Sequence, residues 1–134
     1  MPTKKTILDG LFGLILGQAE DKARSVSDEY LVTGRRGRST TLKIRHSVEA
    51  ILEKHRYAKI GKTVQPAKRL QATDYRDYQT MYLVYKTSSD AFICHYESYF
   101  IRAFAKRLDN KHENSTGRLA MVEDMNYLYV VVAD

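Results

Sequence analysis

The sequence has few of the features that mark secreted, zinc-binding or membrane-spanning proteins. Its one cysteine, Cys94, excludes an internal disulfide and a zinc cluster. The apolar run from Ile7 to Leu16 is interrupted by Asp9, lacks a signal-peptide cleavage pattern and is too short to cross a bilayer. No zinc finger or recognition helix is visible. These absences predict an intracellular protein, cytoplasmic or nuclear, without a membrane partner.

The composition is that of one folded domain with a basic surface. Hydrophobic residues make up 43% of the chain and charged residues 28%, a balance that favours a packed core over disorder. A length of 134 residues suits a single core. The formal net charge is +6, so we expect an acidic partner, and nucleic acid is the most common one.

The first 56 residues are predicted to be a helical and basic N-terminal extension. Apolar residues at spacings of three and four predict a helix from Lys4 to Arg24. Gly10, Gly13 and Gly17 weaken that helix by roughly 1 kcal/mol each relative to alanine, so tertiary contacts must hold it. Glycines at this spacing allow close packing within the chain, which we favour, or a homodimer interface.

A glycine-punctuated basic loop, residues 34–41, follows a weak strand predicted from Asp28 to Thr33. Arginines on such a loop can contact a phosphate backbone without reading its sequence, and the alternative is a solubilising surface loop. A helix to about His55 is expected next, capped by Ser39 or Thr40. The predicted nucleic-acid contacts of this region are Arg35, Arg36, Arg38, Lys43 and Arg45.

The stretch from Tyr57 to Leu70 is predicted to be a strand, a turn and a helix. The strand ends where Gly61 lets the backbone turn, and Pro66 begins the helix. Lys62 in the turn and Arg69 inside the helix would form a cationic corner able to hold a phosphate. The alternative is an ordinary strand, turn and helix whose basic residues are solvated.

A polar, aromatic link at residues 73–78 is predicted to lead into a central strand from Met81 to Lys86. Tyr75, Tyr78 and Arg76 in the link could stack on or hydrogen-bond to a nucleic acid. Tyrosines in such links more often pack their rings at the edge of a core, and we favour that interpretation.

Residues 87–90 are predicted to cap a helix that runs from Asp90 to Leu108. This helix carries a lone carboxylate, Glu97, at the border of its apolar stripe. In a cleft, such a carboxylate can bind a hard cation such as Mg²⁺. The alternative is an exposed Glu97 paired with Arg102 or Lys106.

The order of these segments resembles the GIY-YIG nuclease superfamily. The match consists of a strand with Ile60-Gly61-Lys62-Thr63, a helix with Arg69, a second strand and a helix with Glu97. It covers roughly residues 57–108 and corresponds to the second half of the family's motif. The resemblance implies an α/β (α+β) sandwich within a single domain, in which residues 57–134 form the core as a short mixed or antiparallel sheet flanked by helices.

The sequence departs from the family pattern at two points. Lys59 stands where the family has a tyrosine, and no Gly-Ile-Tyr strand precedes it, because residues 48–55 are predicted to be helical. A strand predicted at residues 127–132 could take the place of the missing strand in the sheet. Asn110 or Asn114 could fill the role of an asparagine that some members carry near the active site.

The resemblance implies metal-dependent hydrolysis of DNA, with Mg²⁺ or Mn²⁺ as the cofactor. Glu97 would bind the metal, Arg69 would hold a phosphate oxygen, and Lys62 would add positive charge. The general base stays open among three candidates. The candidates for the general base are Tyr57, Tyr129 and His95. Two further residues, Lys68 and Arg76, are predicted to contact the nucleic acid.

Three functions remain open at this point. The first is a metal-dependent DNA endonuclease. The second, motivated by Lys59 and the missing motif, is a catalytically inactive nucleic-acid-binding protein on the same fold, and the third is a protein-interaction domain. A structure that places Arg69 and Glu97 on opposite faces would contradict catalysis and favour the binding protein.

Overall fold

The fold is built on a four-stranded mixed sheet with helices on both faces. The structure is a computed structural model that describes residues 24–110 and 125–134. The α+β fold predicted from the sequence is confirmed. The predicted first helix and Asn114 lie outside the described residues. The elements are β1 (Ser25–Ser27), α2 (Arg38–Lys54), β2 (Tyr57–Thr63), α3 (Pro66–Leu70), β3 (Thr80–Thr87), α4 (Asp90–Ala103) and β4 (Asn126–Ala133), with short 3₁₀ helices at Thr73–Tyr75 and Ala105–Arg107.

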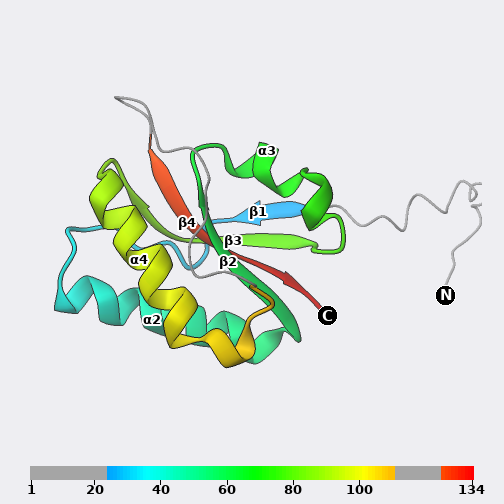
Figure 1. The fold of residues 1–134 in the computed structure, drawn as a ribbon, viewed down its shortest axis with the longest axis horizontal. Helices are drawn as coiled ribbons and strands as arrows, with labels where there is room; N and C mark the ends of the chain where they lie inside the picture. Colours follow the sequence, from blue (N-terminus) through cyan, green and yellow to red (C-terminus); the bar gives the residue numbers. More distant parts are fainter. Residues whose placement is uncertain (1–23, 111–124) are drawn as a thin grey trace, which may run out of the picture.

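The last strand, β4, lies in the interior of the sheet, whose strand order is β1-β3-β4-β2 (Figure 1). It pairs antiparallel with β2 on one side and with β3 on the other, whereas β1 pairs parallel with β3. Residues 128–132 are all buried, as expected for a strand that is covered on both faces. The prediction that residues 127–132 form a strand of this sheet is confirmed.

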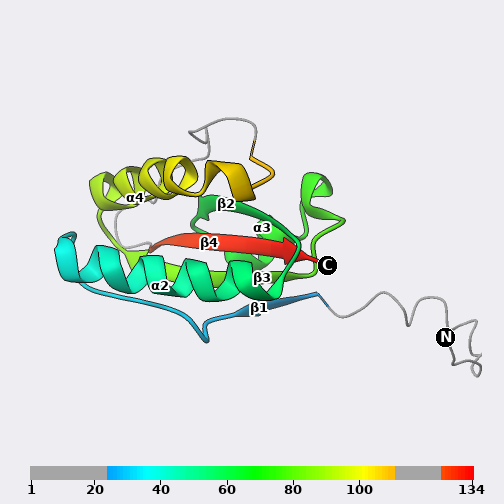
Figure 2. The same ribbon diagram turned by 90° about the horizontal axis from the view of Figure 1, so that it is seen from below.

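Helices α2 and α4 run side by side over one face of the sheet, and α3 lies on the other face (Figure 2). The larger core lies under α2 and α4, and the smaller one lies under α3. Because Ile44, Val48 and Ile51 of α2 belong to the larger core, α2 is part of the same core as the sheet and not an extension in front of it. Each such buried side chain contributes roughly 1.5–3 kcal/mol.

The helix boundaries follow the predicted pattern, but only one of the two predicted caps is present. The hydroxyl of Ser89 accepts a hydrogen bond from the Phe92 N–H at 3.0 Å, which confirms the cap of α4. Helix α2 begins at Arg38 with Gly37 as its N-cap residue, so no side chain caps it. The strand predicted at residues 28–33 is replaced by β1 and by a single bridge between Val32 and Tyr85.

Gly61 lies inside β2 and does not turn the chain, so the predicted turn at Gly61 and Lys62 is wrong. The strand continues to Thr63, and Gly61 lies opposite Tyr129 of β4. A Cβ atom at position 61 would lie 2.4 Å from the Tyr129 hydroxyl oxygen and 2.6 Å from its Cζ atom. Glycine is required here because the ring of Tyr129 lies across it.

We expect Gly61→Ala to destabilise the protein by about 1–3 kcal/mol, because the added methyl group forces the buried ring of Tyr129 to move. Gly37→Ala is the matched control, since no atom lies within 4 Å of its Cβ position. Urea unfolding of both variants measures the difference. Equal losses of unfolding free energy in the two variants would show that the position of the Tyr129 ring does not require a glycine at position 61.

Candidate functional site

The arginine loop, residues 34–38, is held to the core by two buried tyrosines. The Tyr85 hydroxyl donates a hydrogen bond to the Gly34 carbonyl oxygen at 2.6 Å. The Tyr96 hydroxyl accepts one from the Gly37 N–H at 3.2 Å. Both tyrosines are fully buried, and their rings meet edge to face with centroids 5.0 Å apart. The backbone of the loop is therefore fixed at both of its glycines.

The side chains of Arg35, Arg36 and Arg38 are exposed around the N-terminal end of α2. The first turn of this helix contains no acidic residue, and no side chain caps it. The N–H groups at a helix N-terminus and the helix dipole add positive potential to that of the arginines. This end of the molecule therefore attracts anions.

Lys43 and Arg45, the other predicted contacts on α2, differ in exposure. Lys43 is exposed and extends the basic surface of the arginine loop. Arg45 is half-buried, because its guanidinium donates to the Tyr99 hydroxyl at 3.2 Å and lies 5.6 Å from the centre of the Phe104 ring. Arg45 therefore joins α2 to α4.

His95 lies on α4 close to the arginine loop and not beside Arg69. Its ring stacks on Tyr99 with centroids 5.9 Å apart and is half-buried. Burial, together with the positive charges of Arg36 and Arg102, lowers the pKa of His95. The imidazole is therefore neutral at pH 7, but it does not share a site with the predicted phosphate-binding arginine.

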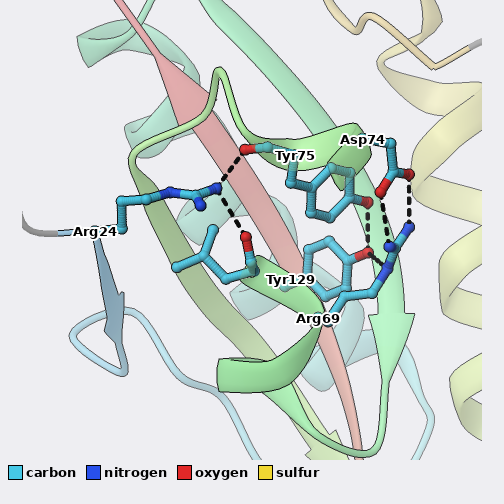
Figure 3. Close-up of polar contacts among 6 residues, drawn as sticks. Arg24, Arg69, Asp74, Tyr75 and Tyr129 are labelled. Carbon is cyan, nitrogen blue, oxygen red and sulfur yellow. Dashed lines mark hydrogen bonds and ion pairs between the residues drawn. The ribbon is translucent and has the colours of Figure 1, made fainter. Parts of the chain in front are cut away.

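Arg69 lies in a cluster of tyrosines on the α3 side of the sheet (Figure 3). Its guanidinium donates to the two carboxylate oxygens of Asp74 at 3.1 and 3.2 Å and to the Tyr129 hydroxyl at 3.3 Å. It also lies 4.2 Å from the centre of the Tyr75 ring. The hydroxyls of Tyr75 and Tyr129 are 2.5 Å apart. The predicted cationic corner is therefore an arginine that is already paired with a carboxylate.

Tyr129 is a poor candidate for the general base. Burial raises the pKa of Tyr129, and its hydrogen-bonded neighbour Tyr75 raises it further. Burial likewise raises the pKa of Tyr75. Both phenols therefore stay protonated at neutral pH, and their hydroxyls position Arg69 in the cluster.

Glu97 lies on the buried face of α4 and forms an ion pair with Lys62 of β2, with Oε1 and Nζ 3.8 Å apart. The Glu97 side chain is 3% exposed and the Lys62 side chain 5% exposed. The alternative of an exposed Glu97 paired with Arg102 or Lys106 is therefore wrong, and so is the prediction that Lys62 lies in a turn. Lys62 is buried because β2 continues past Gly61 and directs alternate side chains to opposite faces. Within the described residues, no three His, Cys, Asp or Glu side chains are grouped as metal ligands.

The structure does not bring Arg69 and Glu97 together. Lys62 lies opposite Leu128, which belongs to the core under α2 and α4. Tyr129, the next residue along β4, belongs to the core on the other face. Glu97 therefore meets Lys62 on one side of the sheet, and Arg69 meets Tyr129 on the other. One phosphate cannot contact both residues in this arrangement.

Of the remaining predicted residues, three are exposed and the two tyrosines of the link are buried. Tyr57 is 45% exposed at the start of β2, four residues before Gly61. Four residues of a strand span about 13 Å, so Tyr57 lies away from the Tyr129 ring that covers Gly61. Lys68 of α3 and Arg76 are exposed on the α3 side of the sheet. The tyrosines of the link, Tyr75 and Tyr78, are buried in the smaller core, as favoured from the sequence.

Asn110 closes part of the open edge of β2, a contact that the sequence did not indicate. Its side-chain amide donates to the Ile60 carbonyl oxygen at 2.8 Å and accepts from the Ile60 N–H at 2.9 Å. The Asp109 N–H donates to the Ala58 carbonyl oxygen at 2.8 Å. Edge strands expose such groups to other chains, so these contacts protect the edge.

Arg24 is a second residue whose role sequence reasoning missed. Its side chain donates to the carbonyl oxygen of Tyr75 (Figure 3). It also donates to the carbonyl oxygens of Leu70 at 2.8 Å and of Tyr78 at 3.1 Å. Leu70 ends α3, Tyr75 ends the neighbouring 3₁₀ helix and Tyr78 follows it, so Arg24 fixes the segment that carries Tyr75. No local pattern indicates this contact, because it joins residues about 50 positions apart.

Comparisons of the chain with protein-family models, with curated proteins and with solved structures gave no match. The resemblance to the GIY-YIG superfamily therefore rests on the sequence segments alone and stays a prediction. Among the described residues, no helix is long and apolar enough to cross a membrane.

We expect Tyr129→Phe to cost about 1–3 kcal/mol of unfolding free energy, because it leaves the buried hydroxyl of Tyr75 without this partner. The double variant Tyr75→Phe, Tyr129→Phe should cost less than the sum of the single variants, because both hydroxyls are removed together. Tyr57→Phe, at an exposed position, is the control. Additive losses in urea unfolding would contradict the coupling.

Proposed function

We propose that the protein is a nucleic-acid-binding domain that contacts the phosphate backbone through its arginine loop. The observation that carries the proposal is that buried Tyr85 and Tyr96 hold the backbone of a loop whose three arginines are exposed. A solubilising loop would not need such anchors. The separation of Arg69 from Glu97 further favours binding over cleavage.

An anchored loop has a physical advantage in binding a polyanion. A flexible loop must lose conformational freedom when it binds, whereas this loop is already ordered by the fold. Each arginine that neutralises a phosphate releases condensed counterions, and the net charge of +6 adds long-range attraction. Phosphate contacts carry no sequence information, so the affinity should be similar for different sequences.

Hydrolysis of phosphodiester bonds is the second candidate, and the position of β4 favours it. This strand lies beside β2, where a strand replacing the family's first motif would lie, and places Tyr129 next to Arg69. The buried Lys62 and Glu97 pair lies on the other face and supplies no exposed metal ligand to this cluster. We therefore rank binding without cleavage first.

Replacing Arg35, Arg36 and Arg38 by alanine should weaken nucleic-acid binding roughly tenfold or more and reduce the salt slope by about 2–3, because three phosphate contacts are lost. Fluorescence anisotropy with labelled duplexes of unrelated sequence, at several salt concentrations, measures both quantities. The matched control replaces the exposed Arg56, Arg102 and Lys106, which removes the same charge at positions not predicted to contact nucleic acid. Equal losses in the two variants would assign binding to net charge alone.

Tyr85→Phe tests the anchoring of the loop separately from its charge. The substitution removes the hydrogen bond to Gly34 and keeps every arginine. We expect an affinity about threefold weaker with an unchanged salt slope, because the number of neutralised phosphates stays the same. Tyr82→Phe on the same strand is the control. An unchanged affinity for Tyr85→Phe would show that the anchor is irrelevant to binding.

Incubation with supercoiled plasmid separates the two candidate functions. We expect retardation of the plasmid without nicking, in Mg²⁺ and in chelator alike, because Arg69 and Glu97 do not share a site. Nicking that requires Mg²⁺ and is abolished by Arg69→Ala would establish hydrolysis instead. Gel electrophoresis after removal of the protein distinguishes retardation from cleavage.

A further inference from the structure

We propose that Tyr82, His55 and Asp134 form a nucleophilic site, in which the Tyr82 hydroxyl takes up an acyl group from an aryl ester or a thioester. Tyr82 belongs to β3, His55 is the C-cap residue of α2, and Asp134 follows β4. The site includes no residue of the arginine loop, so the proposal goes beyond the proposed function and does not depend on it.

The imidazole of His55 has a hydrogen-bond partner at each of its two nitrogen atoms. Its Nδ1 lies 3.1 Å from the Asp134 Oδ1, and its Nε2 lies 3.3 Å from the Tyr82 hydroxyl oxygen. Because an ionised carboxylate only accepts hydrogen bonds, Nδ1 carries the proton of the neutral ring. The lone pair of Nε2 then accepts the hydrogen bond that the Tyr82 hydroxyl donates. A nucleophile, a general base and a carboxylate that orients the base are thus connected in one line.

Neighbouring residues hold this line of groups in place at the surface of the protein. Arg107 donates to the His55 carbonyl oxygen at 3.1 Å, which fixes the end of α2. The Tyr82 ring meets the Tyr30 ring edge to face, with centroids 5.5 Å apart. His55 and Tyr82 are half-buried, and the Asp134 side chain is 71% exposed. A small acyl donor can therefore approach from solvent.

The surroundings of Tyr82 make its attack depend on a base. Burial raises the pKa of Tyr82, and the charge of Glu29 raises it further, whereas the charge of Lys54 acts in the opposite direction. The phenol is therefore protonated at neutral pH. Its proton has to leave as the new bond forms, and the Nε2 of His55 is within hydrogen-bonding distance to take it.

The acidity of a phenol determines which acyl donors Tyr82 can use. A tyrosine phenol has a pKa of about 10 and a thiol one of about 8.5, so a thiolate leaves the acyl carbon more readily than a phenolate, and an alkoxide leaves less readily. The Tyr82 oxygen bonds to the carbonyl carbon, and the bond from that carbon to the thiol sulfur or aryl oxygen breaks. The phenol proton passes to His55 and then to the leaving group. Water later releases the acyl group as a carboxylic acid.

The wild-type protein tests the proposal with 4-nitrophenyl dimethylcarbamate, whose leaving group is more acidic than tyrosine and whose carbamoyl group is hydrolysed slowly once transferred. Tyr82 should be carbamoylated at least about tenfold faster than Tyr57, although Tyr57 is the more exposed residue. Peptide mass spectrometry at successive times and constant pH measures both rates. Equal rates, or a faster reaction at Tyr57, would overturn the proposal.

His55→Gln should slow the carbamoylation of Tyr82 about 100-fold and leave that of Tyr57 unchanged, because glutamine forms hydrogen bonds but does not take up a proton. His46→Gln, at an exposed position of α2, is the matched control. An unchanged rate at Tyr82 in His55→Gln would overturn the proposal. Thermal unfolding checks each fold, and the wild-type comparison of Tyr82 with Tyr57 needs no variant.

Asp134 acts through His55 and is a positioning residue. Asp134→Asn should slow the reaction of Tyr82 roughly tenfold, because an amide can also donate a hydrogen bond and no longer fixes the tautomer of His55. Asp134→Glu should restore most of the rate, since it keeps the carboxylate. Equal rates in the two variants would overturn the role of Asp134.

The class of acyl donor is tested by the hydrolysis of 4-nitrophenyl acetate and, separately, of a small acetyl thioester, with ethyl acetate as the alkyl-ester control. Turnover of the first two that is lost in Tyr82→Phe supports the proposal, and turnover of one only assigns the site to that donor. Turnover that persists in Tyr82→Phe and is lost in His55→Gln would make the imidazole the nucleophile and overturn the proposal. Turnover of neither donor would also overturn it.

Discussion

The ring of Tyr129 lying across Gly61 is the contact on which the organisation of the molecule depends. It joins the last strand to β2, although 60 or more residues separate them along the chain. The same ring carries the hydroxyl that meets Tyr75 and Arg69, so the position of β4 determines where the arginine points. A sheet contact between backbone and ring thereby fixes the polar cluster on the α3 side.

The pleat of β2 explains why Lys62 and Arg69 lie on different faces of the sheet. Neighbouring residues of a strand point in opposite directions, so Gly61 faces α3 while Lys62 faces α4. Lys62 is buried with Glu97, and Arg69 stays half-exposed on the far side. The arginine loop is anchored on the face that α2 and α4 cover, through tyrosines of β3 and α4.

The sequence predicted the elements better than it predicted the site. Periodicity located α2, α4 and the strand at residues 127–132, because each presents a long apolar pattern. Gly61 was misinterpreted as a turn because the reason for a glycine there is the ring of Tyr129, a partner far away in the sequence. The burial of Glu97 depends in the same way on where β2 lies beneath α4, and local spacing cannot determine that. The hydroxyls of Tyr85 and Tyr96 were missed because an apolar pattern reports the rings and not the hydrogen bonds at their ends.

Asn110 has a consequence for the solution behaviour of the whole molecule. Its side-chain amide offers Ile60 one donor and one acceptor, which is what the backbone of a neighbouring strand would offer. One residue thus imitates a fifth strand without adding its length or its apolar surface. A second molecule that approaches this edge finds the hydrogen-bonding groups of Ile60 already satisfied, so the sheet does not grow from one protein into the next at this point.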